Sequence, residues 1–282
     1  MKTIRLLAFL LLALPMMSAC GAQGEEAKEI ELVYVVWDSE IASNHVVKIA
    51  LEQAGYDVTL TSVEQGIMWS SVADGSADAH VAGWLPEDMK VHYEQHKDDI
   101  IDLGANLEGA QTGLAVPTYM EIDSIEELSA DVVSTITGID AGAGVMMTTE
   151  EALREYGMDD VTLSASSDAI MTAELGNRYA AQEPIVITAW QPHWKFNSYD
   201  LKFLEDSKGI YEANGEIRTI VRAGLAEEKP EVYRILDQFY WTADDMNEVM
   251  LYMAKDGMEP EEAAEKWVNA NQDKVDEWLK GV

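Results

Sequence analysis

The feature that most constrains this chain is a regular alternation of apolar, strand-like runs with stretches of helical periodicity from residue 31 onward. The runs are bounded by glycine, proline or charged residues, which is typical of short buried strands. They read ELVYVVW, YDVTLTSV, DAHVAGW, GLAVPTYM, VVSTITGID, DVTLSAS, PIVITAW and IRTIVRAGL. Alternating strands and helices predict an α/β fold in which most strands are parallel.

Two of these runs lie where the chain can pass between two lobes. GLAVPTYM contains Pro117, and proline disfavours a central strand position. IRTIVRAGL can carry the chain back. We therefore predict a lobe I of residues 30–115 together with 218–282, a lobe II of residues 116–217, and a ligand cleft between the two lobes.

Local signals predict where several helices begin. Ser43 or Asn44 is expected to cap a helix that follows the first strand. Thr148 and Glu151 form a capping-box pair that predicts the start of another helix. Residues 229–282 have the pattern of amphipathic helices, and their tryptophans are expected to lie in the core.

The N-terminal region has the pattern of an export signal. Two basic residues precede an apolar run, 6–17, which is shorter than the ~20 residues that a spanning helix needs. Small residues and Cys20 follow, which resembles the lipidation site of bacterial lipoproteins. We predict a signal peptide at 1–19 and a lipidated tether at 20–29. The protein is then expected to be extracytoplasmic, anchored by lipid to the cell membrane, at its outer face or in the periplasm.

The net charge of −33 excludes two classes of partner. Nucleic acids and anionic lipid surfaces are bound through basic patches, and this chain has a large acidic excess. We therefore expect the ligand to be a small molecule. The protein is expected to act as a monomer.

Tryptophans mark the ends of three predicted strands. VITAWQP and HVAGWLP share a small residue, a tryptophan, one further residue and a proline, and Trp37 ends the first strand. A glycine turn, residues 142–144, follows a fourth strand. Ligands of open α/β sheets bind at the carboxyl ends of strands. Indole faces attract a quaternary ammonium group, and a glycine turn before a helix offers N–H groups to an anion. The combination predicts a site for a methylated ammonium zwitterion.

These motifs resemble a known family. VVWDSEIAS, GWLP, GIDAGAGV, AWQPHWKF and TIVRAGL are similar to stretches of the substrate-binding proteins of glycine betaine/proline betaine ABC importers. The resemblance runs from about Val33 to the C-terminus. It implies a two-lobed periplasmic-binding-protein fold of type II-like architecture that closes around its ligand, and delivery to an ABC permease with ATPase subunits. It implies no cofactor.

The resemblance also assigns roles to residues. It implies a cage of Trp37, Trp84 and Trp190 around the ammonium group, and backbone donors at Gly144 and Val145 for the carboxylate.

Three further positions are accessory in this interpretation. Met89 stands where many relatives have a histidine that helps to hold the carboxylate. His193 and Trp194 belong to the family's PHW pattern, and Trp194 is expected to pack near the cleft.

Alternatives remain open at this point. An enzyme is disfavoured, because no nucleophile motif is present, no catalytic residue is assigned, and nothing in the sequence pairs two carboxylates. His92 and His96 have the spacing of two metal ligands on one helix face, although a solvated polar face fits them better and no metal site is assigned. Choline or carnitine, which share the trimethylammonium group, remain alternative ligands.

Overall fold

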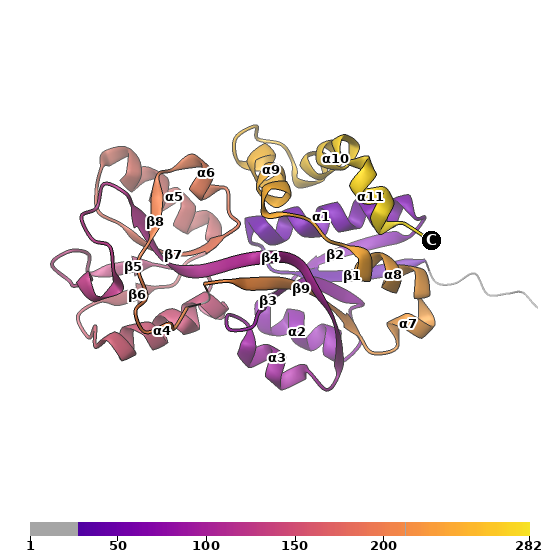
Figure 1. Cartoon of the computed structure of the whole chain (residues 1–282), viewed down its shortest axis with the longest axis horizontal. Helices are drawn as coiled ribbons and strands as arrows, with labels where there is room; N and C mark the ends of the chain where they lie inside the picture. Colours follow the sequence, from indigo (N-terminus) through magenta and orange to yellow (C-terminus); the bar gives the residue numbers. More distant parts are fainter. Residues whose placement is uncertain (1–27, 212) are drawn as a thin grey trace, which may run out of the picture.

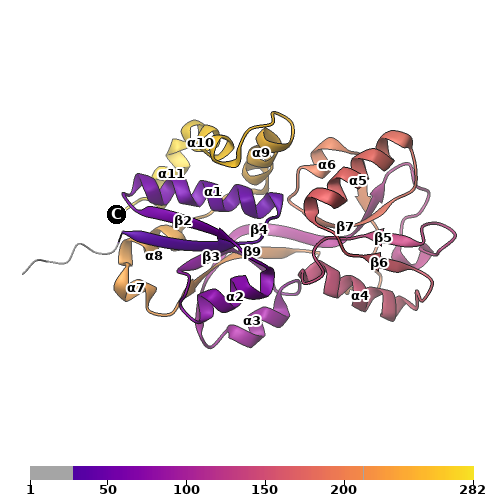
Figure 2. The ribbon, with the colours of Figure 1, turned by 180° about the vertical axis from the view of Figure 1, so that it is seen from behind.

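The computed structural model describes residues 28–211 and 213–282 of the chain. Cys20, the signal peptide and most of the tether lie outside the described residues. Two α/β bodies lie side by side, and two long strands run from one into the other (Figures 1 and 2). Within the described residues, no helix combines the length and apolar character needed to cross a bilayer.

The first lobe contains both ends of the described chain. Its strands and helices up to the crossing are β1 (Glu29–Tyr34), α1 (Asp38–Gln53), β2 (Asp57–Ser62), α2 (Gln65–Ala73), β3 (Ala79–Leu85) and α3 (Lys90–His96). The C-terminal part adds α7 (Leu225–Glu228), α8 (Pro230–Gln238), α9 (Ala243–Ala254), α10 (Pro260–Ala270) and α11 (Gln272–Trp278). The run of helices predicted for residues 229–282 is thereby confirmed.

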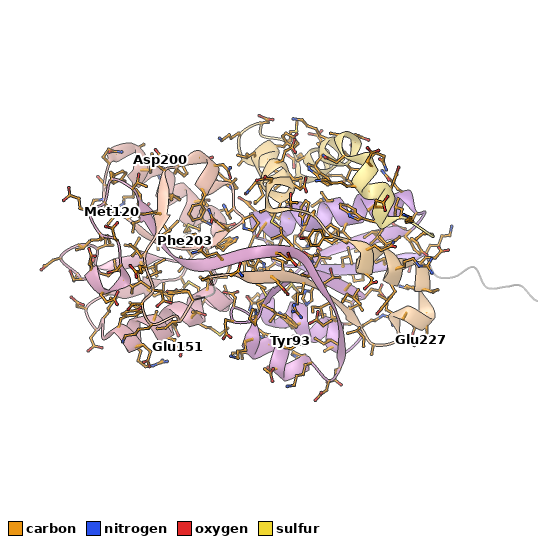
Figure 3. The ribbon with its side chains drawn as sticks, viewed as in Figure 1. Tyr93, Met120, Glu151, Asp200, Phe203 and Glu227 are labelled. Atoms are coloured by element: carbon orange, nitrogen blue, oxygen red, sulfur yellow. The ribbon has the colours of Figure 1, made fainter. Side chains whose placement is uncertain are left out.

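The second lobe is built from the middle of the chain. Its elements are a short 3-10 turn (Ile125–Glu127), β5 (Thr135–Thr137), α4 (Gly144–Tyr156), β6 (Thr162–Ser164), α5 (Asp168–Ala181), β7 (Val186–Gln191), α6 (Lys195–Ser198) and β8 (Leu201–Phe203). Figure 3 shows Met120, Asp200 and Phe203 on this lobe, and Tyr93 and Glu227 on the other.

Strands β4 (Ile100–Pro117) and β9 (Gly215–Arg222) join the two lobes within one sheet of order β2-β1-β3-β9-β4-β7-β5-β6. Strand β4 pairs with β9 up to Ala110 and with β7 from Gln111, so its partner changes between these two residues. Pro117 is the last residue of β4 and lies opposite Leu201 of β8. The lobe boundaries expected at 115/116 and 217/218 remain a prediction.

Pairing is parallel within each lobe and antiparallel at the crossing. Strand β1 is parallel to β2 and β3, and β5 is parallel to β6 and β7. Strand β9 is antiparallel to β3 and β4, and β7 is antiparallel to β4. The carboxyl ends of the parallel strands of both lobes therefore define edges at which loops can meet.

Two predicted helix starts are wrong. Helix α1 begins at Asp38, and Ser43 and Asn44 lie inside it, where their side chains donate to the main-chain oxygen of Glu40. This is the alternative use that such polar side chains have within a helix. Helix α4 begins at Gly144 rather than beside Thr148, so the glycine turn is itself the amino end of the helix.

The C-terminal tryptophans are core residues, as expected. Trp241, Trp267 and Trp278 are almost completely buried. Trp267 and Trp278 stack with their ring centroids 6.0 Å apart, and Trp241 meets Trp267 edge to face at 5.7 Å. This aromatic cluster attaches the last helices to the first lobe.

Candidate functional site

Three tryptophans from different strand ends meet around one cavity between the lobes. Trp37 directly precedes α1, Trp84 is the penultimate residue of β3, and Trp190 is near the end of β7. Only 4–5% of each side chain is exposed, and the rings of Trp37 and Trp190 lie 6.2 Å apart with a tilt of 50°. The cavity is small in this structure. Its other lining residues are Asp88, Thr112, Ile139, Ala143, Gly144 and Val145.

Two of the indole N–H groups form hydrogen bonds between the lobes. Trp37 of the first lobe donates to Oδ2 of Asp140 in the second lobe at 3.0 Å. Trp190 of the second lobe donates to Oγ of Ser39 in the first at 3.3 Å. Because the N–H groups have partners away from the cavity lining, the apolar ring faces are the surfaces available to a ligand.

The third indole is held by a buried acid. Trp84 donates from Nε1 to Oε1 of Glu40 at 2.8 Å, and Glu40 is fully buried on α1. Burial raises the pKa of Glu40 to about 8, against the opposing effect of the Trp84 hydrogen bond. Glu40 is therefore a neutral acid at pH 7, and it fixes the orientation of Trp84 without placing a full charge behind it.

The amino end of α4 forms the other wall of the cavity. Gly144 and Val145 are the first two residues of α4, where main-chain N–H groups lack partners within the helix. The N–H of Gly144 donates across the lobes to Oε1 of Gln65 at 3.1 Å. The positive end of the helix dipole and these donors favour an anion at this place.

The turn after β3 departs from what the sequence suggested. Met89 is fully buried, its N–H donates to the main-chain oxygen of Trp84 at 2.9 Å, and it is absent from the cavity lining. The preceding residue, Asp88, lines the cavity instead. Sequence reasoning missed Asp88, although its place four residues after Trp84 was a usable signal.

A buried polar cluster lies beside the cage at the lobe junction. The N–H of Asp38 donates to Oδ2 of Asp168 at 3.0 Å, and Nε2 of His193 lies 3.2 Å from the same oxygen. Nε1 of Trp194 donates to Oδ2 of Asp38 at 2.5 Å. Asp38 belongs to the first lobe and the other residues to the second. The structure thus brings the carboxylates of Asp38 and Asp168 together, a pairing that no sequence motif indicates.

Burial shifts the pKa values of the ionisable side chains in this cluster. Burial and the charge of Asp168 raise the pKa of Asp38. Burial acts in the same direction on Asp168, but His193, Lys195 and the Asp38 N–H together lower its pKa. Burial and the neighbouring Lys195 lower the pKa of His193. Lys195 is fully buried, and burial lowers its pKa to about 7.

The same cluster is the one place, among the described residues, where three metal-ligating side chains come together. Oxygen or nitrogen atoms of Asp38, Asp168 and His193 lie within 4.8 Å of one another. These carboxylates already accept hydrogen bonds from protein groups, and the amine of Lys195 lies close by. The three side chains therefore do not suit an added metal cation. His92, considered with His96 as a metal-binding pair, is not part of this cluster.

Comparison with known proteins places this geometry in context. The chain is 49% identical over 167 residues to the glycine betaine/carnitine transport binding protein GbuC of Listeria monocytogenes serotype 1/2a (strain 10403S). That match covers 58% of this chain and 55% of the length of the relative.

Solved structures match over nearly their whole length. Lactococcal OpuAC, in its closed-liganded conformation complexed with glycine betaine, is 44% identical, with a TM-score of 0.86 over 89% of this chain and 99% of that chain. The glycine betaine, L-proline binding protein ProX of Borrelia burgdorferi is 35% identical, with a TM-score of 0.87 over 90% of this chain and 97% of that chain. These matches confirm the predicted two-lobed periplasmic-binding-protein fold.

The family profile described as the substrate-binding domain of ABC-type glycine betaine transport systems matches residues 28–270. Members of this family bind a solute for transport and are not enzymes, which confirms the interpretation made from the sequence. Because this match covers most of its length, the chain belongs to the family of substrate-binding proteins of ABC-type glycine betaine transport systems.

Proposed function

We propose that the protein captures glycine betaine, or a related betaine such as proline betaine, and delivers it to an ABC permease. The observation that carries this proposal is the meeting of Trp37, Trp84 and Trp190 around one cavity beside the amino end of α4. The relatives named above support it, because their descriptions refer to glycine betaine.

The chemistry of the cavity suits a methylated ammonium group. Such a group is positively charged but has no N–H to donate, so a carboxylate gains little directional bonding from it. Three indole faces provide cation–π attraction and dispersion together, at about 2 kcal/mol for each desolvated contact. The ligand's carboxylate would then be held by the helix dipole and by the N–H groups of Val145 and Gly144, where it would take the place of Gln65.

The division of the site between two lobes suits a receptor that closes. Trp37 and Trp84 belong to the first lobe, and Gly144, Val145 and Trp190 belong to the second. A ligand that touches both sets favours the closed arrangement by its differential affinity for it. A permease can distinguish the closed, loaded protein from the open one by shape.

The proposed setting is the outer face of the cell membrane. Cys20 carries lipid in this proposal, the protein acts as a monomer, and its partners are a membrane permease with cytoplasmic ATPase subunits. The substrate-binding proteins of ABC importers work outside the cytoplasm, in agreement with the export signal expected at residues 1–19.

Titration calorimetry with glycine betaine, proline betaine, carnitine, choline and ectoine tests the proposal. We expect the tightest binding for a betaine, with micromolar or lower dissociation constants, and the weakest for ectoine, which lacks a quaternary ammonium group. Carnitine and choline are the alternative ligands. Failure of every methylated ammonium compound to bind the folded protein would overturn the proposal.

A further inference from the structure

Asp88 brings a carboxylate into a cavity that is otherwise suited to a cation and an anion at opposite ends. It lies in the turn between β3 and α3, four residues after Trp84, and it lines the same cavity as the three tryptophans. It is half-buried, and its Oδ1 is shielded from solvent.

The carboxylate lies against the amino end of α4. A Cβ placed on Gly144 would lie 2.5 Å from Oδ2 and 2.7 Å from Cγ of Asp88, and it would collide with the main-chain oxygen of Asp88. Gly144 is the first residue of α4, so this is the place where the helix dipole favours negative charge. A carboxylate of the protein therefore lies where the proposed ligand's carboxylate would be held.

Two carboxylates at one helix end repel each other. A zwitterion that enters with its ammonium group in the cage must displace Asp88, or tolerate a like charge at short range. A quaternary amine with a hydroxyl group in place of the carboxylate is instead attracted to Asp88. Its hydroxyl can donate to Asp88, and its net positive charge is balanced by the aspartate.

We propose that Asp88 is a specificity-determining residue of this site, which weakens the binding of carboxylate-bearing betaines and strengthens that of hydroxyl-bearing quaternary amines. The inference rests on the proposed function, because it concerns the ligand held by the same cage. In a site without such an aspartate, only the ligand's carboxylate would occupy the amino end of α4.

The test compares Asp88→Asn and Asp88→Ala with the wild type by calorimetry, using glycine betaine and choline. Both variants remove the charge, and asparagine retains the size. We expect the ratio of the choline dissociation constant to the glycine betaine dissociation constant to rise at least about tenfold in both, because one charge-assisted hydrogen bond is lost and one repulsion removed. Circular dichroism confirms that each variant is folded.

A matched control removes the neighbouring charge outside the cavity. Glu87→Gln changes an exposed acid one residue away, so the ratio should stay within about twofold of the wild type, as for a screened surface charge. An unchanged ratio in both Asp88 variants would overturn the inference. Equal changes in Glu87→Gln would also overturn it, since the effect would then be a general charge effect.

Tetramethylammonium separates this inference from the function on which it rests. It has neither a carboxylate nor a hydroxyl group, so its binding reports the cage alone. If the wild type binds neither it nor the two larger ligands, the proposed function fails. If the wild type binds them and the Asp88 variants keep the wild-type ratio, the function stands and the role of Asp88 fails.

Discussion

The amine of Lys195 lies 3.7 Å from the centre of the Trp190 indole, fully buried at the lobe junction. Its Nζ has no hydrogen-bond partner among the described residues. The charged groups that influence it are Asp168 and Asp38, with His193 beside them. A cage tryptophan is thus supported by a lysine whose charge is easily lost.

Lys195 should make stability depend on pH above neutrality. The unfolded chain keeps this proton up to about pH 10.5, whereas burial lowers the folded pKa to about 7. The unfolded state therefore binds more protons in this window, and the free energy of unfolding should rise with pH from about 7 to 10.5. The contribution is about 1.4 kcal/mol per pH unit. Urea unfolding across this range, for the wild type and Lys195→Met, measures it as the difference between the two curves.

The control for Lys195 is an exposed lysine. Lys280→Met removes the same charge from the C-terminal end of the chain, where the side chain is 73% exposed. Its difference curve should be flat between pH 7 and 10.5. A flat curve for Lys195→Met as well would show that the buried amine does not titrate in this window.

Glu40 should give the opposite dependence at lower pH. The unfolded chain releases this proton near pH 4.5, whereas the folded protein holds it up to about pH 8. The folded state binds more protons between these values, so the free energy of unfolding should fall by about 1.4 kcal/mol per pH unit as pH rises. Glu40→Gln keeps an oxygen for the Trp84 N–H and should lack this fall in urea unfolding from pH 5 to 8. Parallel curves for the two proteins would contradict a neutral Glu40.

The cage tryptophans should affect binding more than stability. Replacing Trp37, Trp84 or Trp190 with alanine should weaken glycine betaine binding at least about tenfold, since each desolvated cation–π contact contributes about 2 kcal/mol. Calorimetry on the folded fraction measures this. Trp267→Ala is the matched control, because it removes a buried indole far from the cavity and should lower the melting temperature while leaving affinity nearly intact. Equal affinity losses in all four variants would disprove the cage.

Gly144 should be required for closure. The reason is the close approach of Asp88 across the lobes, since Gly144 does not have a positive φ. A methyl group in Gly144→Ala should hold the lobes apart, so that betaine no longer reduces the radius of gyration measured by small-angle scattering, as we expect it to do in the wild type. Gly142→Ala is the control, because a Cβ there meets nothing within 4 Å. Normal closure of Gly144→Ala would show that this contact can relax.

Cys20 should hold the protein at the membrane. Two or more acyl chains anchor stably, whereas one chain anchors only marginally. Cys20→Ser in the producing cell should move the protein from the membrane fraction to the soluble fraction, or leave its leader uncleaved. A Cys20→Ser protein that sediments fully with membranes after normal processing would point to a different anchor.

Much of the cavity was predictable because sheet topology does the assembling. Trp37 and Trp84 lie at the carboxyl ends of strands in the first lobe, and Trp190 lies near the carboxyl end of β7 in the second lobe, so the strand ends of the two lobes face each other across the cavity. The polar residues around the first cage residue also had a signal, since Asp38, Ser39 and Glu40 directly follow it.

Contacts between the lobes were not predictable in the same way. Gln65 and Asp168 lie in ordinary helix starts, and nothing in their local sequence indicates which loop of the other lobe they meet. The start of α4 was misplaced because Thr148 and Glu151 match a local capping pattern, whereas the helix extends back to Gly144, whose N–H bonds to Gln65 of the other lobe. A local capping pattern determines where a helix begins only if no tertiary contact extends the helix further.

The position of β9 between β3 and β4 has a consequence for biosynthesis. The two neighbours of β9 are made long before it, since β4 ends at Pro117 and β9 begins at Gly215. A nascent chain that lacks this strand has a gap in the middle of its first sheet, and it cannot complete that lobe. Because long-range pairing is slow and each lobe folds as a unit, we expect the first lobe to stay unfolded until synthesis is nearly finished. Delayed folding of this kind would suit a polypeptide that crosses a membrane before it folds, as the signal peptide expected at residues 1–19 implies.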